Sequence, residues 1–351
     1  MKSYKDAIWF FLACLVFIMS VPNVVAETLY VDNISGSDKN AGTEDKPLKT
    51  IGQVALLTNS KAEPGPTTIK IAPGIYNIDK CVVFENSRPY TEKERLIIEA
   101  TILPDNPNWK PALMPVISST EDPRQPEKID VLTETYSIKI KVSHVTIRGL
   151  KFLGNPLLNN WHCCVERVGE NLDDLLVTQC MFVGDKDAFD IYSAALATGN
   201  RFVIDHCIFV NCHACSVFWD GMEGIPGKGC SMRYCIVDGA YISGVWTCQT
   251  AEDFDFHHNI VTRSEYLWMR KPGDKQKYRL NDCIVTSNRY YSGYGVANGP
   301  TGQTGPEVTY EGKNVIKEGE VTLVKDKRAR NYLHIAEGTF GSELGAGLFK
   351  K

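Results

Sequence analysis

The chain has 351 residues, of which 43% are hydrophobic and 23% charged, and its 38 basic and 42 acidic side chains give a net charge of −4. This composition can form a sizeable core, so it excludes a disordered tail and a small disulfide-stapled domain. Because there is no excess of positive charge, it also excludes a polybasic nucleic-acid binder, and we expect no nucleic-acid partner.

Residues 1–26 have the pattern of a secretory signal peptide. Lys2 and Lys5 precede a nearly continuous apolar run from Ala7 to Ser20, and Ala26 ends a group of small residues. An uncleaved membrane anchor is the alternative interpretation. We expect cleavage after Ala26, no later membrane contact, and a location outside the cell, in the periplasm or on the cell surface.

The N-terminal segment, residues 27–66, contains one short helical pattern. Ile51, Val54 and Ala55 fall on one face of this helix, which predicts a cap on the apolar end of a solenoid. Upstream, the turn with Asp38, Asn40 and Gly42 offers oxygen ligands to calcium, or is simply a turn. Calcium is therefore an open cofactor assignment.

From residue 145 onward the chain repeats one phrase, an apolar strand, polar turn residues, a small or amide side chain and a second apolar pair. Successive anchor residues are 24 to 31 residues apart. The anchors are Leu150, Cys180, Cys207, Cys235, Asn259, Cys283 and Asn314. Such a period with short β-branched strands predicts coils stacked along an axis, with the anchors forming a buried ladder.

The segments on both sides of the repeats resemble a known family, the secreted right-handed parallel β-helix proteins of the pectin-lyase-like fold. Tyr30-Val31-Asp32 with Gly36-Ser37-Asp38 is similar to the start of such proteins, the stretch 69–76 to their first coil, and 331–347 to their closing segment. The resemblance implies an all-β, single-stranded right-handed parallel β-helix of roughly nine or ten coils. We expect a helical cap in 27–66, coils in 67–325 and a closing segment in 326–351.

Within these families the strand that follows each repeated phrase often lines the substrate groove. If Val217, Val245 and Leu267 point inward, strand alternation places Phe218, Trp246 and Trp268 outside on successive coils. Exposed aromatic rings can stack on sugar rings, so we expect them to bind a polysaccharide. Alternatively, loop 221–229 or 271–277 covers them, or the register differs by one residue and they belong to the core.

Charged residues on the same strands suggest two reactions. Asp187, Asp190 and Asp220 could act as acid and base in glycoside hydrolysis. Arg270, Lys271 and Lys275 could instead abstract a proton and neutralise a carboxylate in β-elimination from a uronate. The basic residues beside the aromatic row favour the lyase, with the hydrolase second. A non-catalytic carbohydrate-binding or surface-structural β-helix is the third interpretation.

A second outward column precedes the anchors and contains Thr178, Asp205, Arg233, His257 and Asn281. We expect an Asp205–Arg233 pair with His257 beside it, where a histidine could act as acid or base. Cys212 and Cys215 have a zinc-like spacing, but the chain has no second C-x-x-C pair, so we predict no metal centre. We expect a monomer.

Overall fold

The structure is a computed structural model that describes residues 26–85, 87–124, 132–157, 160–248, 253–274, 276, 278–296, 299–304 and 312–350. Apart from Ala26, the predicted signal peptide lies outside these residues, as does Lys275. No helix in the described ranges is long and apolar enough to cross a membrane.

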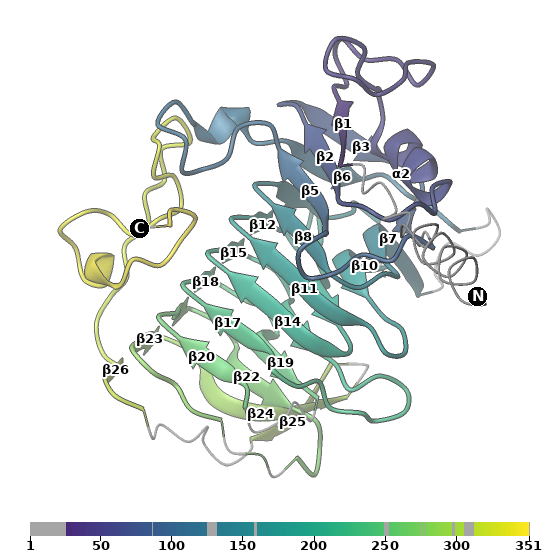
Figure 1. Cartoon of the computed structure of the whole chain (residues 1–351). Helices are drawn as coiled ribbons and strands as arrows, with labels where there is room; N and C mark the ends of the chain where they lie inside the picture. Colours follow the sequence, from purple (N-terminus) through teal and green to yellow (C-terminus); the bar gives the residue numbers. More distant parts are fainter. Residues whose placement is uncertain are drawn as a thin grey trace, which may run out of the picture.

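The chain winds into a right-handed parallel β-helix, as the sequence predicts, with three sheets running along its length (Figure 1). Within the described residues, sheet A has eight strands, β1 (Glu27–Val31), β2 (Thr67–Ile71), β5 (Leu96–Ala100), β8 (Val145–Arg148), β11 (Asp173–Thr178), β14 (Asn200–Asp205), β17 (Ser231–Arg233) and β20 (Asp255–His257). Sheet B has nine, β3 (Ile75–Ile78), β6 (Val116–Ser119), β9 (Lys151–Leu153), β12 (Met181–Val183), β15 (Ile208–Val210), β18 (Ile236–Asp238), β21 (Ile260–Thr262), β23 (Cys283–Thr286) and β26 (Val315–Ile316). Sheet C also has nine, β4 (Val82–Phe84), β7 (Thr133–Ile140), β10 (Asn160–Arg167), β13 (Ser193–Ala197), β16 (Ala214–Phe218), β19 (Ser243–Thr247), β22 (Tyr266–Arg270), β24 (Tyr290–Val296) and β25 (Gly299–Thr304).

Equivalent positions of successive coils stack inside the cylinder. In sheet A, Ile69 pairs with Ile98, which pairs with Ile147, followed by Val177 and Ile204. All five are fully buried. β-Branched side chains pack well on a pleated surface, and burying each one contributes roughly 1.5–3 kcal/mol. This ladder explains why one apolar phrase recurs along the chain.

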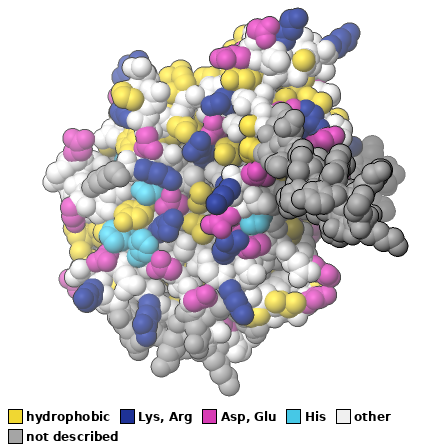
Figure 2. All heavy atoms as spheres, viewed as in Figure 1, with side chains coloured by type: hydrophobic (Ala, Val, Ile, Leu, Met, Phe, Trp, Pro, Cys, Tyr) yellow, Lys and Arg dark blue, Asp and Glu magenta, His cyan; other side chains and the backbone are white. Residues whose placement is uncertain are grey.

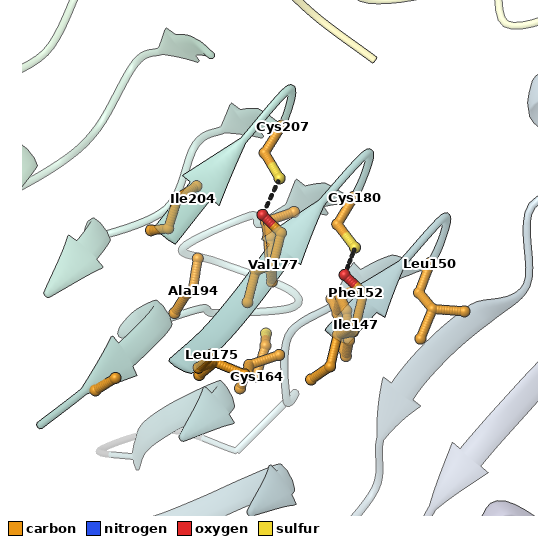
Figure 3. Close-up of a cluster of buried hydrophobic side chains, with 14 of the residues drawn as sticks. Ile147, Leu150, Phe152, Cys164, Leu175, Val177, Cys180, Ala194, Ile204 and Cys207 are labelled. Atoms are coloured by element: carbon orange, nitrogen blue, oxygen red, sulfur yellow. Dashed lines mark hydrogen bonds between the residues drawn. The ribbon is translucent and has the colours of Figure 1, made fainter. Parts of the chain in front are cut away.

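The predicted cysteine ladder is present inside the turns between sheets A and B (Figure 3). Cys180, Cys207 and Cys235 are fully buried, and the thiols of the first two donate weakly to the Ile147 and Val177 carbonyls at 3.8 and 3.6 Å. The buried amide of Asn259 continues the ladder by donating to the Met232 carbonyl at 2.7 Å. The described cysteines are free thiols.

The last predicted anchor is wrong by one residue. Cys283 pairs with Val315, so Val315 occupies the next ladder position. Asn314 stands in the left-handed turn conformation with φ 58°, as Asp282 does in the coil before it, and its amide donates to the Asp282 carboxylate at 2.8 Å. Asparagine tolerates this conformation better than most residues, which explains its place in the turn.

The two ends of the solenoid are closed differently. Helix α2 (Ile51–Asn59) begins where the Thr50 hydroxyl accepts a hydrogen bond from the Gln53 N–H, and it buries the predicted face with Ile51, Val54 and Ala55. At the other end, β25 pairs with β24 in antiparallel orientation, whereas the other strand pairs of sheet C are parallel. Beyond it, β26 ends sheet B.

Residues 320–350, here called the C-terminal strap, run back along the outside of sheet B and end beside the early coils (Figure 1). The strap contains the 3-10 turn η2 (Ser342–Leu344) and passes the loop that holds η1 (Pro111–Leu113). The Phe349 ring packs edge-on against Trp109 at 5.7 Å, and the Arg330 guanidinium donates to the Asn106 and Pro107 carbonyls. The strap thus spans many coils.

Candidate functional site

The outer face of sheet C is hollowed into a groove of about 530 Å³ that extends from β7 to β24. Five of its sixteen lining residues are aromatic, and charged groups lie among them. The lining residues are Glu134, Tyr136, Trp161, Cys163, Glu166, Tyr192, Ser193, Leu196, Val217, Trp219, Asp220, Met222, Trp246, Cys248, Lys271 and Gly295.

The strands of sheet C present these side chains because each strand bends. Two consecutive residues face the core, Val165 after Cys164 in β10 and Trp268 after Leu267 in β22. The positions on either side of this inward pair therefore point outward. They form two outer ladders, Tyr136, Cys163, Ser193, Ala214, Ser243 and Tyr266 in one, and Lys139, Glu166, Leu196, Val217, Trp246 and Met269 in the other.

This bend overturns part of the predicted aromatic row. Phe218 and Trp268 are core residues that are at most 1% exposed, and the Trp268 indole N–H donates to the Thr247 hydroxyl at 2.8 Å. Val217, expected inside, lies in the groove. Trp246 does face outward as predicted, because it follows the inward residue Val245. Strict alternation fails where two neighbouring side chains both face the core.

Arg270 is likewise misplaced by the predicted register. It follows Phe218 and Thr247 in an inward ladder and is only 4% exposed. Its guanidinium lies 5.5 Å from the Tyr294 ring and donates to the Gln276 carbonyl at 3.4 Å. Arg270 therefore does not line the groove, and the next residue, Lys271, does.

Asp220 and Lys271 meet at one end of the groove. Lys271 Nζ donates to Asp220 Oδ2 at 2.8 Å, and this hydrogen bond raises the pKa of the lysine. Asp220 is buried, with 3% of the residue exposed, and its second oxygen, Oδ1, has no hydrogen-bond partner in the structure. Buried polar atoms normally have a partner, so an unpartnered carboxylate oxygen beside a groove is a candidate ligand contact.

Asp187 and Asp190 lie outside the groove lining. The segment 184–192 forms a loop in which Asp185 pairs with Phe189, so β13 starts only at Ser193. Asp187 is exposed in this loop. Asp190 faces His213, with 3.3 Å between Oδ1 and Nε2, and burial raises the pKa of its carboxyl to about 6.

Several groove residues were not predicted. Trp161 and Tyr192 stand at the start of successive strands and stack with ring centroids 5.0 Å apart. Glu166 pairs with Lys139 at 3.2 Å, and burial raises the pKa of the Glu166 carboxyl. Glu134 accepts a hydrogen bond from the Tyr136 hydroxyl at 2.6 Å. The aromatic residues near the start of these two strands, Trp161 and Tyr192, were the available signal.

The second predicted column exists, but it belongs to the outer face of sheet A. Arg233 donates to Asp205 at 3.0 Å, and His257 follows Arg233 in the ladder. Figure 2 shows charged and histidine side chains gathered on the face of the molecule that carries β14, β17 and β20. Burial lowers the pKa of His257. These residues lie outside the groove lining.

The predicted calcium turn is held together by its own side chains. Asp38 accepts hydrogen bonds from the backbone N–H groups of Lys49 and Thr50, both at 2.9 Å, and Asn40 donates to the Pro47 carbonyl. These hydrogen bonds hold the turn against residues 47–50 of the N-terminal segment. In the described ranges, no group of three or more His, Cys, Asp or Glu side chains has a metal-binding arrangement.

Comparison with known proteins finds a family model for one segment of the chain and several solved structures. Residues 34–85 match the model of a protein family of unknown function, DUF1565, and no curated protein matches the chain. The matched segment holds the cap and the first coil. The fold of the chain is the three-sheeted parallel β-helix described above.

Solved structures that resemble it include a rhamnogalacturonan lyase, with 14% identity, a TM-score of 0.45, and coverage of 76% of this chain and 70% of that one. A pectin methylesterase from Aspergillus niger has 11% identity, a TM-score of 0.45, and coverage of 86% and 93%. A lacto-N-biosidase from Eubacterium ramulus has 8% identity, a TM-score of 0.40, and coverage of 83% and 68%. These similarities concern the fold.

Proposed function

We propose that the protein is carbohydrate-active and binds a saccharide chain along the sheet C groove. The observation that carries this proposal is a row of aromatic walls interrupted by a few charged groups, with Trp161, Tyr192, Trp219 and Trp246 among the lining residues. Flat rings cover the C–H faces of sugars, and a small number of polar groups then fixes the hydroxyls.

The groove also holds groups for cleavage. Glu166, whose pKa burial raises, is a candidate proton donor, and Asp220 beside Lys271 is a candidate carboxylate base. Glu166 shares a ladder with Val217 two coils further on, roughly 10 Å along the axis, and Asp220 follows Val217 by three residues. We therefore favour hydrolysis of a glycosidic bond.

Lysine-assisted β-elimination is the second candidate, favoured by Lys271 in the groove. It needs a base that loses its proton near neutral pH, and the hydrogen bond to Asp220 raises the pKa of Lys271 in the opposite direction. Arg270, the other base of this hypothesis, is buried outside the lining. The raised pKa of Lys271 and the burial of Arg270 make β-elimination the weaker candidate.

Incubation with a panel of neutral and acidic polysaccharides separates the candidates. New reducing ends without absorbance of unsaturated uronates indicate hydrolysis, and growth of that absorbance indicates elimination. Binding without either product indicates the non-catalytic alternative. If no saccharide binds, the proposal is wrong.

Variants then connect the activity to the groove. Glu166→Gln and Asp220→Asn should each lower the cleavage rate at least about 100-fold, because each removes one proton-transfer group. Asp187→Asn, in the exposed loop, is the matched control and should keep full activity. Trp161→Ala should weaken binding while the chain stays folded. Equal activity of all four variants would place the site elsewhere.

Export is a further part of this proposal, since polysaccharides lie outside cells. N-terminal sequencing of the chain recovered from its native host should begin at Glu27. A chain that starts at Met1 and stays in the membrane fraction would favour the anchor.

A further inference from the structure

The side chains on the floor of the groove change from charged to apolar along the solenoid. In one outer ladder of sheet C, Lys139 and Glu166 are followed by Leu196, Val217 and Trp246 on the next three coils. A strand face that opens to water normally carries polar residues. The apolar half of this ladder therefore needs an explanation.

These apolar residues belong to a cluster on the outside of the sheet. Val217 and Trp246 are buried together with Ala214, Tyr266 and Met269, and Leu196 packs against them. On the rim, Met222 lines the groove and is 91% exposed. Branched and thioether side chains offer no flat surface for a sugar ring, but they suit methyl-sized groups.

The charges of the groove add a second observation. Among the described residues, its lining holds Glu134, Glu166 and Asp220 and one lysine, Lys271, which is paired with Asp220. Lys139, next to the lining, is paired with Glu166. A polyuronate would bring its carboxylates against Glu134, and like charges in a partly buried site repel.

The unpartnered oxygen of Asp220 points to the same class of ligand. A carboxylate oxygen accepts hydrogen bonds only, and sugar hydroxyls are donors that can satisfy it. A ligand carboxylate has no proton to donate at neutral pH.

We infer that the groove takes a neutral glycan that carries small apolar substituents, such as acetyl esters. This inference rests on the proposed saccharide-binding function and names its substrate class. The aromatic walls hold the sugar rings, Asp220 accepts from a hydroxyl, and the surface of Leu196, Val217 and Met222 receives the substituents.

Titration calorimetry with acetylated xylo-oligosaccharides, and with the same oligosaccharides after deacetylation, tests the inference directly. The acetylated form should bind about fourfold more tightly for each methyl group that the apolar surface buries. Oligogalacturonates of similar length should bind more weakly than either. Equal affinity for the two xylan forms, or tighter binding of the oligogalacturonates, would overturn the inference.

Two variants assign the preference to the groove floor and rim. Val217→Thr keeps the shape of the side chain but adds a hydroxyl, and Met222→Ser changes a side chain that is 91% exposed. Both should reduce the ratio of the affinity for the acetylated form to the affinity for the deacetylated form. Ile225→Ser, 63% exposed on the same loop but outside the lining, is the control.

The two proposals fail in different ways. If xylo-oligosaccharides and oligogalacturonates bind and Trp161→Ala weakens them equally, the saccharide function stands and the substituent preference is wrong. If none of these ligands binds, the inference and the proposed function are both wrong. An unchanged preference in Val217→Thr and Met222→Ser would show that the substituents bind elsewhere.

Discussion

Sheets B and C both carry apolar ladders on their outer faces, but different surroundings lie over the two ladders. On sheet B, Ile208, Ile236 and Ile260 are fully buried because strap residues such as Leu333 and Leu348 pack over them. On sheet C, the Leu196, Val217 and Trp246 ladder lines a groove instead. An apolar ladder on an outer face therefore indicates that another surface packs against it. This surface is a segment of the same chain on sheet B, and we propose that it is a ligand on sheet C.

The largest expected effect on the unfolding free energy comes from placing a carboxylate on the outer face of sheet B and, for comparison, on the outer face of sheet C. Ile236→Asp should cost about 3–5 kcal/mol of unfolding free energy, because the strap buries the new carboxylate without a cation. Val217→Asp should cost less, about 1–2 kcal/mol, since Val217 keeps 6% exposure and lines the groove, so that the new carboxylate can turn toward water. Urea unfolding of both variants measures the difference. Equal losses would mean that the groove is closed in solution.

Acid should loosen the covered face. Burial lowers the pKa of His334 to about 4, and its Nε2 accepts a hydrogen bond from the Leu348 N–H at 2.9 Å. The folded-state pKa lies below the unfolded value of about 6.5, so the full stability is present above pH 6.5 and falls as the pH drops toward 4, by up to about 3 kcal/mol.

Amide hydrogen exchange of the strap between pH 7 and 4 measures this loosening, after correction for the intrinsic exchange rate. His334→Gln, which cannot take up the proton, should remove most of the pH dependence in the strap. The buried His162, whose pKa is lowered to about 3, contributes an effect of the same sign in the core and is unchanged in this control. A strap that opens equally with pH in both proteins would contradict the assignment.

The smallest expected effect concerns the end of the strap. Lys350 Nζ lies 2.9 Å from Asp205 Oδ2, but Asp205 also accepts from Arg233 and His206. Lys350→Met should therefore cost no more than about 1 kcal/mol in urea unfolding. A loss above about 2 kcal/mol would make this ion pair, rather than the apolar ladder, the main attachment of the strap.

Much of the fold was predictable because the same kind of buried residue recurs at the equivalent position of successive coils. Cys180, Cys207 and Cys235 mark the same corner of successive coils, and their spacing alone predicts the stack. The helix at Ile51 was equally visible, since the apolar face of Ile51, Val54 and Ala55 defines it.

The site was predicted less well for two reasons. One is the local geometry of the sheet C strands, and the other is contact between residues that are far apart in the sequence. The bend in sheet C puts Leu267 and Trp268 inside together, and no alternating pattern anticipates this, so Phe218 and Trp268 were assigned outside and Glu166 was missed. The strap depends on contacts such as Gln179 with Leu348, 169 residues apart. A local sequence pattern holds no information about such a pairing.

The antiparallel strand β25 has a consequence for assembly. A parallel solenoid whose last strand were exposed would offer a template on which a second chain could continue the sheet. Because β25 runs against β24, the strand direction of sheet C ends there, and a parallel strand of another copy cannot add to β24 in register. At this end, sheet C of one chain therefore does not continue into a parallel sheet of another copy.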